Sequence, residues 1–112
     1  MSNCVTLLGE NQSFSIKDPD EIIPLSIDFT EVLINGETIE SCVFDAEMLG
    51  AGNEDVTMIV GSADISSDPI VSQTVQGGHV GTVYLIRAKI TTSLGYVRVG
   101  AGILPVLRGG AA

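Results

Sequence analysis

Three kinds of side chain in this sequence could do chemistry: a cluster of acids, one histidine and two cysteines. The acids Asp18, Asp20 and Glu21 crowd around Pro19, and hard cations such as calcium bind where several oxygens gather. The cluster lacks the rest of a calcium loop, and Asp before Pro is typical of a turn. We therefore predict a turn with solvated carboxylates, and no metal site.

The histidine and the cysteines do not form a catalytic or metal-binding pattern. His79 follows two glycines, which is typical of a turn, and catalysis would need a nucleophile and an orienting group beside it. Cys4 and Cys42 lie far apart, and together with one histidine they make no zinc pattern. No Gly-x-Ser-x-Gly sequence is present. We expect a non-enzymatic protein that has no cofactor and two reduced thiols.

Two glycine-rich stretches could approach a ligand or another chain closely. The first, Gly50–Asp55, has no Lys-Ser/Thr pair and places two acids where a phosphate would sit, which excludes a phosphate loop. The second, Gly100-Ala101-Gly102, lies inside a strand pattern. It predicts a bulge or the close approach of another backbone, with a partner chain lying against the strand as the alternative.

The charges divide unevenly along the chain. All fourteen acids lie between Glu10 and Asp68, whereas the residues after Asp68 carry four basic side chains and no acid. A net charge of −9 repels nucleic acid. No apolar run reaches the ~20 residues of a membrane helix, and the N-terminus does not resemble a signal peptide. We expect a protein that stays in the cytoplasm where it is made, with neither nucleic acid nor membrane as partner. Its charges either solvate the surface or form opposite faces that meet on neighbouring copies or on a partner.

Hydrophobic periodicity predicts about seven short strands and no amphipathic helix of useful length. The clearest alternation places Leu25, Ile27 and Phe29 on one face of a half-buried strand. The expected strands cover residues 13–16, 23–30, 38–46, 56–60, 70–76, 79–92 and 96–103, with a loop over Gly61–Asp68. Turn signals every ~8–12 residues favour an all-β fold, an immunoglobulin-like antiparallel β-sandwich.

We expect one domain with an extension at each end. Residues 1–12 are expected to form an N-terminal arm or first strand, residues 13–103 the sandwich, and residues 104–112 a C-terminal tail. The last apolar segment either completes the sheet as a strand or adds to a neighbour's sheet edge as an extended arm, and the first segment could do the same. The candidate partner contacts are Val5, Leu7, Leu8, Ile103, Leu104, Val106, Leu107 and Arg108.

Four segments resemble one known family in their order and spacing. They are Lys17-Asp18-Pro19-Asp20-Glu21 with Leu25-Ser26-Ile27-Asp28-Phe29, then Gly36-Glu37-Thr38-Ile39-Glu40-Ser41, Tyr84, and Ile90-Thr91-Thr92-Ser93-Leu94-Gly95. This pattern is similar to that of the phage fibre–tail adaptor family. Two departures stand out: Val43-Phe44 replaces a usual Trp-Thr pair, and the apolar residues Val97 to Leu107 replace a polar, Arg-rich ending.

The resemblance implies an immunoglobulin-like structural protein of a tailed-phage virion. Such a protein docks other virion proteins, here as an adaptor that joins the tail or neck to a fibre. It would be homo-oligomeric in the particle and present in the host cytoplasm during assembly. One alternative is a capsid decoration (cement) protein that staples capsomers. A carbohydrate-binding module is a further alternative, disfavoured because three Phe and two Tyr with no Trp offer few aromatic platforms.

Overall fold

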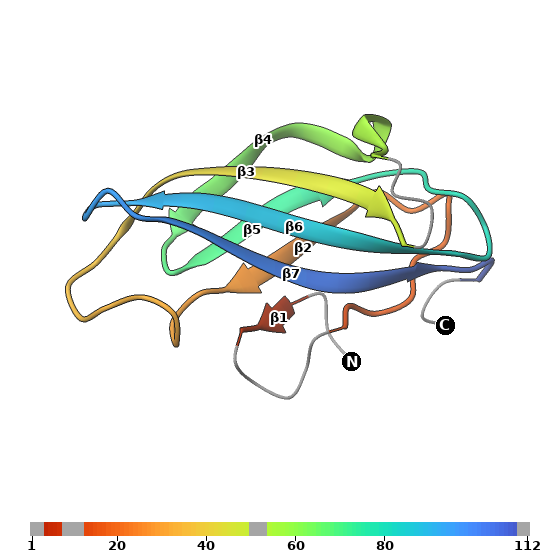
Figure 1. Ribbon diagram of the computed structural model, residues 1–112. Coiled ribbons are helices and arrows are strands. Elements are labelled where there is room, and N and C mark those ends of the chain that lie inside the picture. The colour runs from red at the N-terminus through yellow and green to blue at the C-terminus, as the bar shows by residue number, and fades with distance from the viewer. Residues whose placement is uncertain (1–3, 8–12, 50–53, 110–112) are drawn as a thin grey trace.

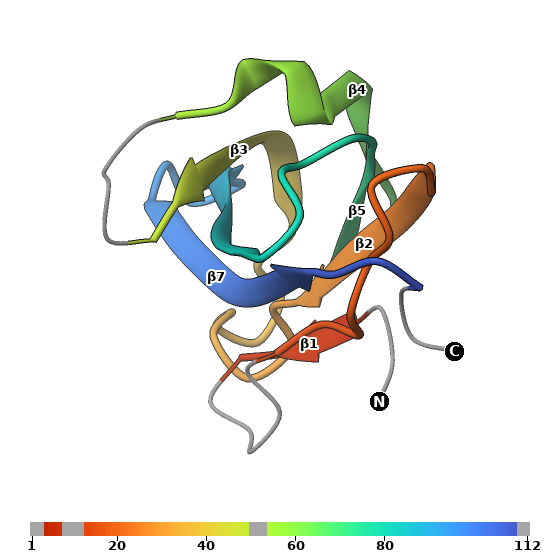
Figure 2. The ribbon, with the colours of Figure 1, turned by 90° about the vertical axis from the view of Figure 1, so that its right-hand side faces the viewer.

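The computed structural model, which describes residues 4–7, 13–49 and 54–109, is a sandwich of two β-sheets. The first sheet has the order β1-β2-β5-β4, and its strands are β1 (Cys4–Thr6), β2 (Ile23–Asp28), β5 (Ile70–Val75) and β4 (Ile59–Ser67). The second has the order β3-β6-β7, and its strands are β3 (Ile39–Met48), β6 (Thr82–Thr92) and β7 (Val97–Val106). Figures 1 and 2 show the two layers from the side and from one end. The predicted all-β, immunoglobulin-like sandwich is confirmed.

Alternating side chains from the two sheets form the core. In β2, Leu25 and Ile27 are fully buried, as is Phe29 directly after the strand, because alternate residues of a strand point to opposite faces. In β6 the buried set runs from Tyr84 through Ile86, Ala88 and Ile90, with the same period of two. No described helix is long and apolar enough to cross a membrane.

The segment that begins at Glu54 differs from the sequence prediction. Val56–Met58 forms a 3-10 helix, η1, whose first turn is capped by the Asp55 carboxylate accepting from the Thr57 N–H. Strand β4 then continues through Ser67, so the loop expected over Gly61–Asp68 is wrong. β4 is an edge strand that pairs only with β5, and its register shifts twice. Its inward residues Ala63 and Ile65 are only partly buried against the core, so its apolar pattern is weak.

The strand expected over 13–16 is not formed. Instead, Ser13 and Lys17 make two isolated parallel bridges to Ile103 and Val106 of β7. The N–H of Phe14 donates to the Ile103 carbonyl at 2.8 Å. This segment covers the C-terminal half of the β7 edge, next to the place where the chain enters β2 (Figure 2).

The two glycines of β7 accommodate the N-terminal strand. β7 pairs with β6 without a register shift, so the bulge expected at Gly100-Ala101-Gly102 is wrong. A Cβ on Gly100 would lie 2.5 Å from Leu7 Cδ1, and a Cβ on Gly102 would lie 2.6 Å from Val5 Cγ2. The close approach is thus made by side chains of the first residues of this same chain.

The expected division into arm, sandwich and tail stays a prediction. Strand β1 falls within the segment 1–12, where it pairs in parallel with β2. Strand β7 extends to Val106, which is past the expected sandwich boundary at Ile103.

Candidate docking surface

The outer side of β7 is a continuous row of apolar residues. Because Gly100, Gly102, Leu104 and Val106 face the core, the residues between them face outward. The outward residues are Val97, Val99, Ala101, Ile103 and Pro105. Val97 is 61% exposed, Val99 53% and Ile103 38%. The strand therefore presents an apolar row to solvent along its whole length.

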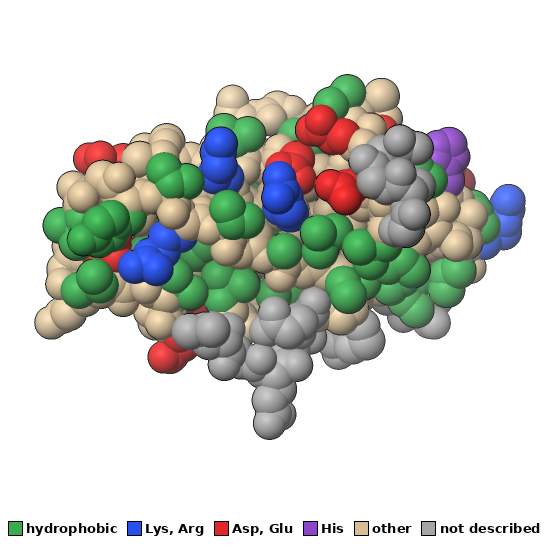
Figure 3. Space-filling view, viewed as in Figure 1, with side chains coloured by type: hydrophobic (Ala, Val, Ile, Leu, Met, Phe, Trp, Pro, Cys, Tyr) green, Lys and Arg blue, Asp and Glu red, His purple; other side chains and the backbone are tan. Residues whose placement is uncertain are grey.

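The neighbouring strands widen this row into a face. Leu85 of β6 pairs with Ile103, and Lys89 of β6 lies between Val99 of β7 and Val43 of β3. Val43 is 64% exposed. We call this set the docking face; it consists of Val43, Val83, Leu85, Lys89, Val97, Val99, Ala101, Ile103 and Pro105. Figure 3 shows hydrophobic side chains gathered on this side of the molecule, over β6 and β7.

Charged side chains lie on the same outer side of the second sheet as the docking face: Asp45 and Glu47 of β3, and Arg87 and Lys89 of β6. Arg87 makes two parallel hydrogen bonds of 3.1 Å to the Asp45 carboxylate across the β3–β6 pair. This is the only salt bridge between described residues. Lys89 is exposed, two positions further along β6, and meets no carboxylate within ion-pair distance in the described chain. The docking face is thus apolar around Lys89, which makes no ion pair, and Glu47, which also makes none, lies on the same side of the sheet across from Leu85.

The outer side of the other sheet has a different character. Ser26 of β2 and Ser72 of β5 share a hydrogen bond of 2.7 Å between their hydroxyls. Asp28 and Asp64 lie on the same sheet, and none of its strands contains Lys or Arg. The basic side chains that lie in strands are therefore all in the second sheet, where β3 also contributes the acids Glu40, Asp45 and Glu47.

Residues 36–41 and 90–95, two of the segments that resemble the adaptor family, meet at the end of the β6–β7 hairpin. The N–H of Ser93 donates to the Thr38 carbonyl at 2.8 Å, and the N–H of Thr38 donates to the Ser93 hydroxyl at 3.0 Å. Residues 36–41 and 90–95 are thereby held side by side. Leu94 and Tyr96 nearby are about half exposed, and the Arg98 guanidinium lies 5.8 Å from the centre of the Tyr96 ring.

Glu37 lies buried beneath this contact. Its Oε1 accepts from the Ile34 N–H at 2.9 Å. The nearby Thr92 hydroxyl, followed by the Ile34 N–H and the Arg98 charge, holds the pKa of Glu37 below its usual range. Glu37 Oε2, Thr92 Oγ1 and Arg98 Nε are nevertheless buried without a hydrogen-bond partner in the described structure.

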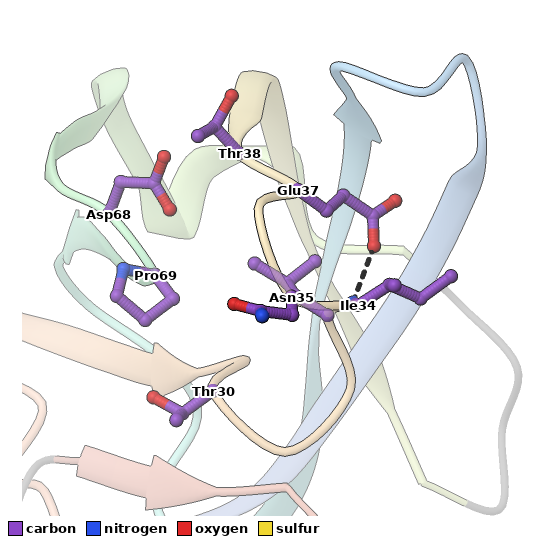
Figure 4. A pocket seen from close by; sticks show the side chains of 8 residues that line it. Thr30, Ile34, Asn35, Glu37, Thr38, Asp68 and Pro69 are labelled. Atoms are coloured by element: carbon purple, nitrogen blue, oxygen red, sulfur yellow. Dashed lines mark hydrogen bonds between the residues drawn. The ribbon is translucent and has the colours of Figure 1, made fainter.

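A shallow pocket of about 350 Å³ opens beside the same loop (Figure 4). It is lined by Thr30, Leu33, Ile34, Asn35, Glu37, Thr38, Asp68 and Pro69. Asp68 Oδ2 accepts from the Ile39 N–H at 2.9 Å, and in Figure 4 the Glu37 carboxylate points away from Asp68. Both carboxylates thus accept hydrogen bonds from backbone N–H groups, and they do not face each other as an acid–base pair.

Lys17 has a structural role that sequence reasoning did not find. It is fully buried, and its Nζ donates to the carbonyls of Gly77 at 2.8 Å and Asp18 at 2.9 Å. Burial lowers its pKa, and the acids Glu21, Asp18 and Asp20 oppose that shift. The sequence offered one signal: Lys17 is the only basic residue among the fourteen acids.

The acidic cluster beside Lys17 forms a closed turn. Asp18 accepts from the N–H groups of Asp20 and Gly109, each at 2.7 Å, and these bonds lower its pKa. Glu21 Oε1 accepts from the Asp18 N–H at 2.7 Å. The described residues contain no group of three side chains that could hold a metal ion. The carboxylates are thus engaged with backbone, and the turn interpretation fits this geometry.

The two cysteines and the histidine lie in different parts of the fold. Cys4 is in β1 and Cys42 is in β3, and no disulfide joins them. Burial raises the pKa of Cys42 to about 11, and burial and then the Asp28 charge raise that of Cys4. The N–H of His79 donates to the Tyr84 hydroxyl at 2.9 Å in the turn before β6.

The structure divides the candidate partner contacts into two groups. Val5, Leu7, Leu104 and Val106 are buried in the core. Ile103, Leu107 and Arg108 are exposed, and Ile103 belongs to the docking face. Leu8 lies outside the described residues. Of the five aromatic residues, only Tyr96 is exposed, so no platform of stacked aromatics is available.

One comparison with known proteins finds a match. A family model described as podophage GP4 fiber-tail adaptor protein gp77 matches residues 17–104, which is most of the chain and includes every segment of the resemblance. No curated protein matches the chain. The chain therefore belongs to the podophage GP4 fiber-tail adaptor family, whose members are structural proteins of the phage particle.

Proposed function

We propose that this protein joins the tail or neck of a phage particle to a fibre by binding virion proteins on its surface. The observation that carries the proposal is the docking face. Large contiguous apolar patches on a protein surface mark sites of protein association. A rigid sandwich can present this face without paying much ordering entropy on binding.

The exposed candidate contacts extend the docking face toward the C-terminus. Ile103 lies on the face, and the exposed Leu107 and Arg108 follow directly after β7. We propose that these three residues contact a partner. A contact role for Val5, Leu7, Leu104 or Val106 stays a prediction, and it would require the side chain to leave the core.

The wider setting follows from the same proposal. The protein acts in the virion, is present in the host cytoplasm during assembly, and is homo-oligomeric in the particle. Its mechanism is protein–protein docking, without chemistry on a substrate.

One observation favours capsid decoration as a second candidate function. The apolar ending, Val97 to Leu107, departs from the Arg-rich ending of the family, and most of it forms β7 and the docking face. A changed docking strand could meet a different partner, such as a capsomer.

Copy number in purified particles tests the proposal. The protein's gel band is quantified by densitometry and scaled to the major capsid protein. An adaptor gives a small fraction of the capsid copy number, whereas a decoration protein gives a number close to it. Absence of the protein from washed particles would overturn both functions.

A further inference from the structure

Lys89 is placed unusually for a surface cation. Its two neighbours across the sheet, Val43 and Val99, are 64% and 53% exposed. No carboxylate of the described chain lies within ion-pair distance of it, although the protein carries fourteen acids. The nearest cation on the same strand, Arg87, already holds Asp45. Lys89 is thus a cation without an ion-pair partner that lies between two exposed valines.

Covering the valines would remove water from the lysine between them. A buried charge without a partner costs several kcal/mol in order-of-magnitude terms, whereas a charge that meets an opposite charge in the same interface recovers much of that cost. Charge pairs of this kind also set the specificity and the salt dependence of association. A protein that covers these valines must therefore either leave the Lys89 ammonium group in water or place an opposite charge beside it.

We propose that the docking face binds an apolar protein surface that presents a carboxylate to Lys89. This inference rests on the proposed function and specifies the partner of the same face. A second copy of this chain fits less well, because its outer first sheet is polar and a net charge of −9 on each copy opposes self-association. On the same side of the sheet as the docking face, the Asp45 carboxylate is already bound by Arg87, so Glu47 is the carboxylate through which a second copy would bind, and self-association is an outcome of the test.

The test uses phage particles made without this protein, to which the purified full chain is added. Bound chain is measured by co-sedimentation with the particles over a range of concentrations. The first variant, Val97→Thr with Val99→Thr, keeps the β-branched shape and removes apolar surface. Its matched control, Val56→Thr with Ile22→Thr, changes two exposed β-branched residues that lie off the face, 67% and 64% exposed.

The second set of variants tests the charge. Lys89→Met keeps the apolar stem and removes the ammonium, whereas Lys89→Arg keeps the charge. Gln76→Glu, an exposed position off the face, gives the same change in net charge as Lys89→Met. Circular dichroism shows that each variant is folded before binding is measured.

We expect the valine variant and Lys89→Met to bind the particles more weakly than wild type, and the off-face control variants to bind as well as wild type. The valine pair should weaken binding by about tenfold or more, since each 1.4 kcal/mol lost is tenfold. Lys89→Met should also weaken it by about tenfold, and Lys89→Arg should restore it. Salt should weaken the wild type more than Lys89→Met, because only the wild type has the charge pair.

Other outcomes distinguish an error in the proposed adaptor function from an error in the proposed docking face. If wild-type chain does not bind the particles, the adaptor function itself is overturned. If it binds and the valine variant binds equally well, the function stands and the docking face is the wrong surface. Binding by Lys89→Met that equals or exceeds wild type would show a partner without the carboxylate. Dimers that sediment in wild type and are lost in the valine variant would make a second copy the occupant.

Discussion

At the scale of single residues, burial decides what the polar groups of this protein do. Lys17 looks like a solvated turn residue beside Asp-Pro, yet it is fully buried. Its acceptor on Gly77 lies 60 residues away in the sequence, so no local pattern could reveal it. The same holds for Glu37, whose neighbours Thr92 and Arg98 come from the opposite end of the chain.

Replacing Lys17 with Met should destabilise the fold. The change keeps the apolar stem and leaves the carbonyls of Gly77 and Asp18 without their donor. Each unsatisfied buried group costs about 1–3 kcal/mol, so we expect a loss of about 2–4 kcal/mol in the free energy of unfolding, measured with urea. Lys89→Met is the matched control at an exposed site and should change stability by less than about 0.5 kcal/mol. Equal stability of the two variants would contradict the buried role of Lys17.

Cys42 should react slowly with alkylating reagents. Burial raises its pKa from 9.0 to about 11, so at pH 8 almost all of the thiol is protonated, and only the thiolate is nucleophilic. Labelling by iodoacetamide, located by peptide mass spectrometry, should accelerate as the pH approaches 11. The same shift favours unfolding as the pH rises above 9.0, because the unfolded thiol ionises first. Labelling of Cys42 at pH 8 as fast as that of an unfolded peptide would contradict the shift.

At the scale of elements, the success of the sequence prediction follows how each strand is buried. β2 and β6 each have one face on the core, so strict alternation marks them clearly. The expected strand over 56–60 reached only the first two residues of β4, because β4 is an edge strand whose register to β5 shifts twice and whose inward residues Ala63 and Ile65 are only partly buried. In β3 a register shift lets Ile39 face the core out of phase with Phe44, which no strict period-two pattern allows.

The candidate contacts show the same limit. The sequence showed that the apolar residues near Leu104 form either a last strand or an arm. It did not show which of them point inward, because that depends on where the strand begins and ends. β7 sends Leu104 and Val106 inward and Ile103 outward. The docking face additionally needs Val43, Leu85 and Lys89, which the sequence scatters over two other strands.

The packing of β1 against β7 predicts strong coupling between Leu7 and Gly100. Gly100→Ala places a Cβ 2.5 Å from Leu7 Cδ1, and such overpacking costs about 1–3 kcal/mol. Leu7→Ala alone should cost about 2–5 kcal/mol because it leaves a cavity. In the double variant the new methyl occupies part of that cavity. We expect it to be about 1–2 kcal/mol more stable than the sum of the single changes, measured by urea unfolding.

Additive losses would mean that Leu7 does not pack on Gly100 in solution. Gly102→Ala serves as a comparison, because its Cβ would lie 2.7 Å from Phe14 Cε2 and 2.6 Å from Val5 Cγ2. Leu7→Ala should therefore not relieve Gly102→Ala.

At the scale of the whole molecule, charge opposes folding. The protein has a net charge of −9, and its described residues form a single salt bridge, between Arg87 and Asp45. Most carboxylates are therefore not neutralised by a cation. Self-repulsion of like charges destabilises a compact state, and salt screens it over distances of ~8–10 Å near physiological ionic strength.

Sodium chloride should therefore stabilise the isolated protein. We expect Tm to rise by a few degrees, roughly 2–5 °C, between about 20 and 300 mM NaCl, measured by differential scanning calorimetry. Glu31→Gln with Glu40→Gln removes two exposed acids that make no hydrogen bond in the described structure, and it should raise Tm at low salt and flatten the salt response. A Tm that falls with salt would instead show that attractive charge pairs outweigh the repulsion. The salt response of the fold would then run in the same direction as that expected for binding through Lys89, whereas repulsion makes the two run in opposite directions.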